Sequence, residues 1–178
     1  MVKLMLIVVF LLLAALMFYV ATRPASFRIQ RSMRIAAPRD KLFAYACDLH
    51  NFDAWSPWAL LDPAMRKTHF GAASGVGAGY EWQGNNKVGH GRMEIVEAVS
   101  PERVLIKLDF LKPFEAHNMA EYLLAESDGA TEFTWAMYGP NNFLSKAMGL
   151  FFNMDRMVGA QFEQGLRELK TVAERGVA

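Results

Sequence analysis

The sequence predicts an α+β fold, in which a curved antiparallel β-sheet wraps around a long C-terminal helix and one transmembrane helix precedes the domain. Three features lead to this prediction. Residues 4–20 are all apolar or aromatic. Residues 67–138 form short runs in which apolar and polar residues alternate, and turn residues separate the runs. Residues 142–174 carry large apolar side chains at helical spacing.

The apolar run from Leu4 to Val20 contains 17 residues. As a helix it would span about 26 Å, close to the thickness of a hydrocarbon core of about 30 Å. A cleaved signal peptide is the alternative, but it needs small residues just before the cut, and Tyr19 would occupy one of those positions if cleavage followed Ala21. We therefore predict a membrane anchor over residues 1–24 and a single ligand-binding domain over residues 25–178.

Basic residues predict the orientation of this anchor. Lys3 alone precedes the run, whereas six basic residues follow it closely: Arg23, Arg28, Arg31, Arg34, Arg39 and Lys41. The positive-inside rule then places the domain in the cytoplasm as part of a single-pass membrane protein, with export as the alternative. Cys47 is the single cysteine, which excludes an intramolecular disulfide and predicts a buried free thiol.

The segment after the anchor predicts one strand and two helices. Residues 27–35 alternate between apolar and polar side chains, which is typical of a half-buried strand. Arg31 interrupts its apolar face, and would either meet an anionic head group or extend toward the membrane. Residues 38–48 predict a helix with Pro38 in its first turn, and residues 49–55 predict a second short helix.

The remainder predicts a meander of strands closed by one helix. The expected strands are 67–70, 79–83, 88–99, 103–110, 116–126 and 131–138. Turn signals such as Ser100-Pro101 and Lys112-Pro113 separate them, so consecutive strands should pair in antiparallel fashion. Residues 142–174 are predicted to form a single long helix with one apolar side.

The composition argues against several function classes. Nineteen basic and 18 acidic residues give a formal net charge of +1, so nothing favours binding of nucleic acid. The four histidines are widely separated, and we expect no metal and no cofactor. We recognise no catalytic constellation, and the glycines of residues 71–79 are typical of turns and bulges. By strand parity, most of the carboxylates that might serve as a general base point outward: Glu81, Glu94, Glu97, Asp109, Glu115 and Glu121.

Three stretches resemble a known superfamily. They are the Ile-Ala-Ala-Pro segment at 35–38 followed by Trp-Ser-Pro-Trp at 55–58, the glycine-punctuated segments at 75–82 and 84–91, and the Gly-Leu-Arg-Glu-Leu-Lys segment at 165–170. Together they resemble the SRPBCC superfamily, closest to its polyketide cyclase/dehydrase-like branch. This superfamily has the helix-grip fold shared by START lipid-binding domains and the birch-pollen allergen group. The resemblance implies a cavity between the curved sheet and the long helix that holds a lipid-like or polyketide-like molecule.

Strand parity and helical spacing predict the residues that would line such a cavity. They are Tyr80, Trp82, Met93, Ile95, Ile106, Leu108, Phe110, Asn118, Ala120, Tyr122, Phe133, Trp135 and Met137 from the sheet, and Phe151, Met154, Val158 and Phe162 from the helix. A solid core would account for the same apolar pattern without any ligand. Asn118 is the single amide in this row, and either a ligand or a neighbouring protein group would satisfy it.

Two function classes follow, and a third remains open. The first is a membrane-tethered module that binds an apolar small molecule. The second is an enzyme of cyclase or dehydratase type, which would need at least one acid, base or polarising donor inside the cavity. The third is a domain that contacts protein partners and holds no ligand. The sequence does not determine the oligomeric state.

Overall fold

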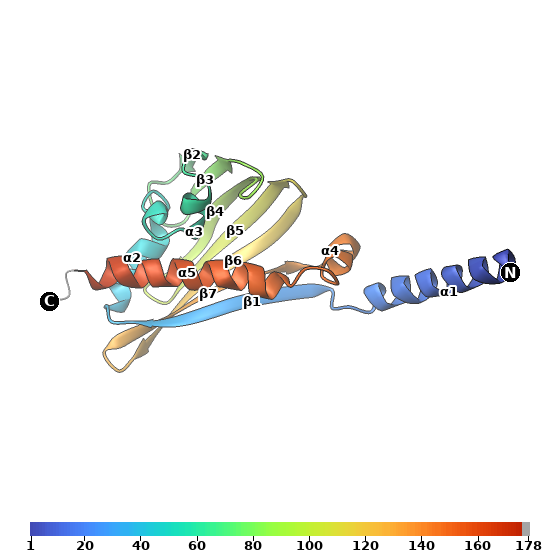
Figure 1. Cartoon of the computed structure of the whole chain (residues 1–178). Coiled ribbons are helices and arrows are strands. Elements are labelled where there is room, and N and C mark those ends of the chain that lie inside the picture. The colour runs from blue at the N-terminus through green and yellow to red at the C-terminus, as the bar shows by residue number, and fades with distance from the viewer. Residues whose placement is uncertain (176–178) are drawn as a thin grey trace.

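An antiparallel sheet forms the body of the protein in the computed structural model, which describes residues 1–175 apart from the side chain of Leu144 (Figure 1). The described strands are β1 (Ser26–Ile35), β2 (Arg66–Gly71), β3 (Ala78–Gln83), β4 (His90–Val99), β5 (Arg103–Lys112), β6 (Ala116–Ser127) and β7 (Ala130–Pro140). They make one seven-stranded sheet in the order β1-β7-β6-β5-β4-β3-β2. The first strand thus pairs with the last, and the predicted α+β helix-grip architecture is confirmed.

The described helices are α1 (Val2–Ala21), α2 (Arg39–Cys47), the 3₁₀ turn η1 (Phe52–Ala54), α3 (Pro57–Leu61), α4 (Phe143–Met148) and α5 (Met154–Glu174). Helix α5 crosses the concave face of the sheet (Figure 1) and buries Phe162, Leu166 and Leu169 against it. Gly165 permits this close approach, because a β-carbon there would lie 2.6 Å from Cζ3 of Trp135 on β7. Cys47 is a buried free cysteine, as predicted, and burial raises the pKa of its thiol.

The prediction of one helix over residues 142–174 was wrong. Two asparagines start two separate helices: the Asn142 side chain accepts a hydrogen bond from the backbone N–H of Ser145 (2.8 Å), and the Asn153 side chain accepts one from Arg156 (2.9 Å). Gly149 lies at the C-terminal end of α4. The apolar spacing that suggested one helix continues through the break, because the segment between α4 and α5 also carries phenylalanines. Periodicity alone therefore missed the change of direction.

The short helices that follow α2 also differ from the prediction. Residues 49–55 form only the 3₁₀ turn η1, and a further short helix, α3, starts with Pro57 in its first turn. The ring of Trp55, between the two, is 1% exposed and packs 5.3 Å from the Trp135 ring. Its Nε1 has no hydrogen-bond partner among the described residues, so this indole serves the packing of the core.

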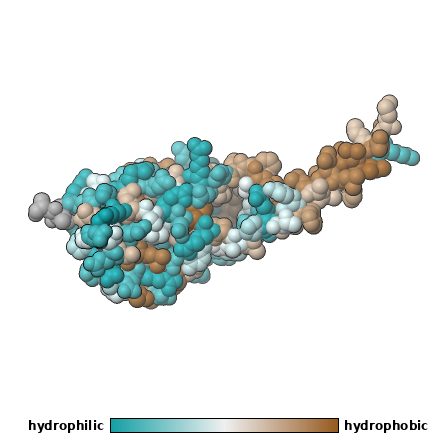
Figure 2. Space-filling view, turned by 90° about the horizontal axis from the view of Figure 1, so that it is seen from below, coloured by the Kyte–Doolittle hydropathy of each residue, from teal (hydrophilic) through white to brown (hydrophobic). Residues whose placement is uncertain are grey.

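Helix α1 is long and apolar enough to cross a membrane, and a signal sequence near the N-terminus has the same properties. Figure 2 shows it as a brown, hydrophobic rod that projects from a mainly teal, hydrophilic domain. Within α1 only Val20 is buried. The other side chains of this helix therefore have no protein environment to cover them in the described structure.

Arg31 joins β1 to α5 and does not point to a ligand. Its Nη1 and Nη2 donate to the Asp155 carboxylate at 3.1 and 3.0 Å, and its Nε donates to Glu163 at 2.9 Å. The guanidinium lies over Gly159, where a β-carbon would be 2.1 Å from Nη2. The hydrogen bond to Asp155 and then the one to Glu163 raise the pKa of Arg31. The interruption in the apolar face of β1 is therefore a polar link to the closing helix.

We expect Arg31→Ala to lower the free energy of unfolding by about 1 kcal/mol, because the link is a half-exposed ion-pair network of the kind that contributes little more. Urea unfolding of the full chain in a mild detergent measures this. Arg156→Ala is the matched control, since Arg156 is exposed in the same turn of α5 as Asp155. Equal losses of unfolding free energy in the two variants would show that the pairing of Arg31 with α5 contributes nothing to stability.

Candidate functional site: an apolar hollow beneath the closing helix

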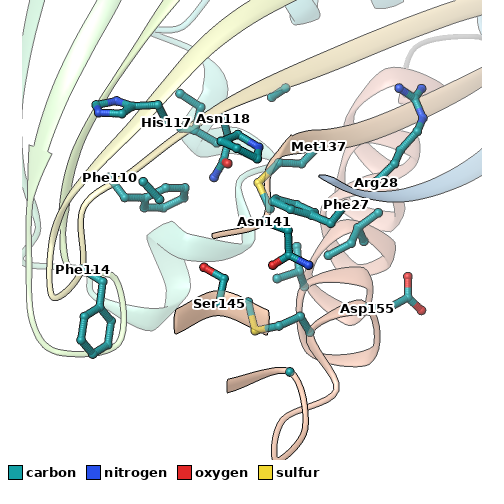
Figure 3. A pocket seen from close by; sticks show the side chains of 18 of the residues that line it. Phe27, Arg28, Phe110, Phe114, His117, Asn118, Met137, Asn141, Ser145 and Asp155 are labelled. Atoms are coloured by element: carbon teal, nitrogen blue, oxygen red, sulfur yellow. The ribbon is translucent and has the colours of Figure 1, made fainter. Parts of the chain in front are cut away.

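A hollow of about 1070 Å³ lies between the sheet and the N-terminal part of α5. Its volume is slightly above the range of about 300–1,000 Å³ that is usual for small-molecule sites. Figure 3 shows that Phe110, Asn118 and Met137 from the sheet and Ser145 from α4 border the same space. The first large buried side chain of α5 is Phe162, and the chain before α5 belongs to α4 and its connecting segment, so the hollow lies beneath the N-terminal part of α5.

The structure places most of the predicted lining residues around this hollow. From the sheet they are Tyr80, Trp82, Met93, Leu108, Phe110, Asn118, Ala120, Tyr122, Trp135 and Met137, and from the closing segment Phe151, Met154, Val158 and Phe162. Ile95, Ile106 and Phe133 are the exceptions. They are fully buried and do not line the hollow. Beside Phe133, the Trp55 ring fills the space at a centroid distance of 6.3 Å. That any of these residues contacts a ligand remains a prediction.

Several lining residues were absent from the sequence prediction. Phe27 and Ile29 line the hollow from β1, and their alternation with arginine and glutamine would have placed them there by parity alone. Phe52, Trp58 and Met65 come from the segment with η1 and α3, and Leu150 and Phe152 come from the segment before α5. The segment with η1 and α3 has no periodic pattern, and the apolar spacing before α5 suggested a continuous helix, so only the tertiary structure brings these residues to the site.

Three residues that line the hollow carry polar groups: Asn118, Tyr80 and Tyr122. No hydrogen bond joins the Asn118 amide or the hydroxyls of Tyr80 and Tyr122 to another described residue, although all three residues are buried. Burial raises the pKa of Tyr80, and burial together with the nearby Tyr80 raises the pKa of Tyr122. Both phenols are therefore neutral and can donate a hydrogen bond to a polar atom of a ligand.

The mouth of the hollow carries more basic than acidic side chains. Arg23, Lys87, Lys112 and Lys146 line it, against Glu115 and Asp155, while the guanidinium of Arg28 pairs with Glu121. Each of these two carboxylates has a cationic partner: Asp155 pairs with Arg31 at 3.0 Å, and Glu115 lies 3.3 Å from the His117 ring. The net character of the mouth is therefore positive.

His117 lies at this mouth and holds a proton more firmly than an isolated histidine. Its Nδ1 is 2.7 Å from Asp109, and this hydrogen bond raises the pKa of the imidazole, with Asp109 and Glu115 adding through their charge. We expect Asp109→Asn to return this pKa toward the ordinary value of about 6.5. Glu115→Gln should lower the pKa less, because Glu115 is the weaker partner.

An NMR titration of the His117 ring in the full chain measures these pKa values. Because the folded-state pKa is raised, the contribution of His117 to stability is complete below the unfolded pKa and is lost as the pH rises through the folded pKa. An unchanged His117 pKa in Asp109→Asn would contradict the assignment of the cause.

The candidate general bases do not gather at the hollow. Glu121 is buried on the outer face of the sheet, where it pairs with Arg28 at 3.0 Å and Arg103 at 2.8 Å. Of the six carboxylates considered from the sequence, only Glu115 lines the hollow, at its mouth. The described residues contain no group of three His, Cys, Asp or Glu side chains that could hold a metal ion. The chemistry that the hollow offers is an apolar surface with a few neutral hydrogen-bonding groups.

The comparison with known families agrees with this architecture. A family model described as "Polyketide cyclase / dehydrase and lipid transport" matches residues 26–174. The chain belongs to this family. The resemblance inferred from residues 35–38, 55–58 and 165–170 is thereby confirmed. No curated protein matches the chain.

Several solved structures resemble the fold of this chain at low sequence identity. Protein CV1439 from Chromobacterium violaceum has a TM-score of 0.58 and 15% identity, with 85% of this chain and 98% of that chain covered. The ginseng major latex-like protein 151 from Panax ginseng has a TM-score of 0.60 and 11% identity, with 84% of this chain and 99% of that chain covered. The di-domain ARO/CYC StfQ from the steffimycin biosynthetic pathway has a TM-score of 0.60 and 12% identity, with 85% of this chain and 51% of that chain covered. At these identities the likeness shows the fold alone.

Proposed function

We propose that the protein binds an apolar small molecule, lipid-like or polyketide-like, in the hollow between the sheet and α5 while α1 tethers it to a membrane. The observation that carries the proposal is a hollow of about 1070 Å³, lined mainly by aromatic and aliphatic side chains, in a protein of this family. A solid core would have closed this space, because protein interiors pack with few voids larger than a water molecule. The distribution of basic residues supports a cytoplasmic domain.

The test is native mass spectrometry of the full chain purified from its host membranes in a mild detergent, followed by extraction and identification of small molecules. The expected result is one apolar molecule per chain, which survives the exchange of detergent. A clean protein that also ignores a panel of lipids and aromatic polyketides would overturn the proposal. That outcome would favour a domain that contacts protein partners and holds no ligand.

An enzymatic role is the second candidate, and the unpartnered phenols favour it. Neutral hydroxyls of Tyr80 and Tyr122 in an apolar surrounding can polarise a carbonyl, as cyclisation or dehydration requires. Among the described residues no carboxylate lines the hollow away from its mouth. Tyr80→Phe and Tyr122→Phe separate the two roles. A binding protein keeps its ligand unaltered in both variants and in the original chain, whereas an enzyme converts it and loses that conversion in the variants.

A further inference from the structure

Helix α4 and the C-terminal end of α1 lie at the same end of the protein (Figure 1), and α4 contributes Ser145 and Lys146 to the lining at the mouth of the hollow. Three hydrogen bonds hold them together. Lys146 of α4 donates from Nζ to the carbonyl of Ala21 (3.4 Å), and Asn141 donates from its backbone N–H to Ala25 (2.7 Å) and from Nδ2 to Pro24 (3.2 Å). Helix α4 is therefore fastened to the link between α1 and β1.

This attachment fixes the height of the mouth above a bilayer that holds α1. The link between Ala21 and Ser26 has four residues, and even a fully extended link would span only about 17 Å. Val20, the last residue of the apolar run, is 2% exposed although the rest of α1 is uncovered. The domain thus begins where the apolar run ends. With residues 4–20 in the hydrocarbon, α4 lies at the level of the lipid head groups.

Exposed aromatic side chains surround this mouth. We define the rim as Phe114, Phe143, Phe151, Phe152 and Met154, which are 56%, 46%, 80%, 53% and 46% exposed. Four of the five line the hollow, and Phe143 belongs to α4, whose Ser145 and Lys146 do so. Outside α1, every exposed phenylalanine of the described residues belongs to this rim. Large apolar side chains that collect at one place on a surface mark an interaction site, unlike single scattered ones.

The charged residues next to the rim indicate which kind of partner covers it. Arg23, Lys87, Lys112 and Lys146 flank it, and the two nearby carboxylates are already paired. Phenylalanines flanked by basic residues are the composition of surfaces that insert into the head-group region of anionic bilayers. Arg23 also lies over the ring of Tyr19, 5.1 Å from its centroid, at the point where α1 leaves the apolar run.

We propose that the rim docks on the bilayer that holds α1, so that the mouth of the hollow opens onto lipid. An apolar ligand would then pass between membrane and hollow without crossing water. The inference rests on the proposed tether and hollow, but it makes its own claim about which surface of the domain touches lipid. The partner is an anionic lipid bilayer, in the same leaflet that receives the C-terminal end of α1.

The first test places a fluorophore at the rim of the full chain. A Cys47→Ser background removes the native thiol, and an NBD group is attached at Phe143→Cys or, as the control, at Glu132→Cys, which is exposed at the far end of β7. The proteins are reconstituted in vesicles of phosphatidylcholine and phosphatidylglycerol. The NBD group at position 143 should emit at shorter wavelength than the one at position 132, be quenched by lipids with brominated acyl chains and be protected from iodide. The NBD group at position 132 should be quenched by iodide and not by the brominated lipids.

The outcomes separate this inference from the proposed function. If both labels are equally open to iodide while the chain remains with the vesicles, rim docking is overturned and the tether stands. If the chain does not remain with vesicles after a carbonate wash, the tether and the docking are both wrong. Neither readout requires a ligand, so failure of ligand binding does not affect them.

The second test measures transfer. Uptake of a pyrene-labelled fatty acid from vesicles is compared with uptake from cyclodextrin for Phe143→Glu and for Val99→Glu, an equivalent exposed position at the far end of β4. We expect Phe143→Glu to slow uptake from vesicles about tenfold, the effect of losing one buried phenyl group. Uptake from cyclodextrin should be unchanged. Equal rates from vesicles for the two variants would contradict a route through the rim.

Discussion

Trp135→Ala is expected to lower the free energy of unfolding by about 4 kcal/mol, the usual cost of deleting a buried indole. Trp135 lies where the sheet, α5 and the short helices meet. Its ring stacks on Phe162 at 4.5 Å and meets Trp55 at 5.3 Å and Trp58 at 5.5 Å. The rings around it are held by three different elements, so they cannot all close the space that the indole would leave. Urea unfolding of the full chain in detergent, followed by near-UV circular dichroism, measures the loss.

Phe151→Ala is the control for Trp135→Ala, because it also truncates an aromatic side chain but at a position that is 80% exposed. We expect a change within about 0.5 kcal/mol for this variant. A loss below about 1 kcal/mol for Trp135→Ala would mean that the core around α5 collapses readily. The hollow next to Trp135 would then be too deformable to hold a ligand of defined shape.

Ala120→Trp is expected to reduce ligand occupancy at least about tenfold, because an indole at this position takes up space that the ligand would need. Ala120 lines the hollow from β6, between Ile106 of β5 and Met137 of β7. The added ring projects into existing space, so the free energy of unfolding should change by less than about 1 kcal/mol. Native mass spectrometry of the full chain gives the occupancy, and urea unfolding gives the stability.

Ala125→Trp is the matched control, since Ala125 is exposed on the same strand. It should retain the co-purified molecule at the original occupancy. If Ala120→Trp also retains it at full occupancy, the molecule binds elsewhere and the hollow is not the ligand site. If Ala120→Trp unfolds, Ala120→Leu offers a smaller intrusion in the same direction and keeps the experiment decisive.

The sheet could be predicted well from the sequence, and the closing segment less well. Tyr80, Trp82 and Met93 face inward because strand parity is a local rule, set by the geometry of the extended backbone itself. The break between α4 and α5 depends on the caps at Asn142 and Asn153, and these compete with an apolar periodicity that runs through both helices. Whether the caps or the periodicity prevail depends on tertiary packing, and the repeat pattern carries no information about that packing.

The candidate site, too, could be predicted from the sequence only in part. The sequence identified inward rows such as Leu108, Ala120 and Met137, but it could not tell a packed core from a hollow lining. Ile106 and Phe133 have the same parity as their lining neighbours and are nevertheless fully buried outside the hollow; Trp55 packs against Phe133. The side on which Trp55 packs depends on a turn whose direction is set by long-range contacts.

By itself the sequence determined the apolar N-terminal helix, the inward-facing rows of the central strands and the family, because each depends on the order of neighbouring residues. The tertiary structure decided that Arg31 serves α5, that a hollow remains beneath that helix, and that four exposed phenylalanines gather around its mouth next to Ala21. These features join residues more than a hundred positions apart. The physical reason for the division is that local backbone geometry can be inferred from adjacent residues, whereas the space left between packed elements depends on all of them at once.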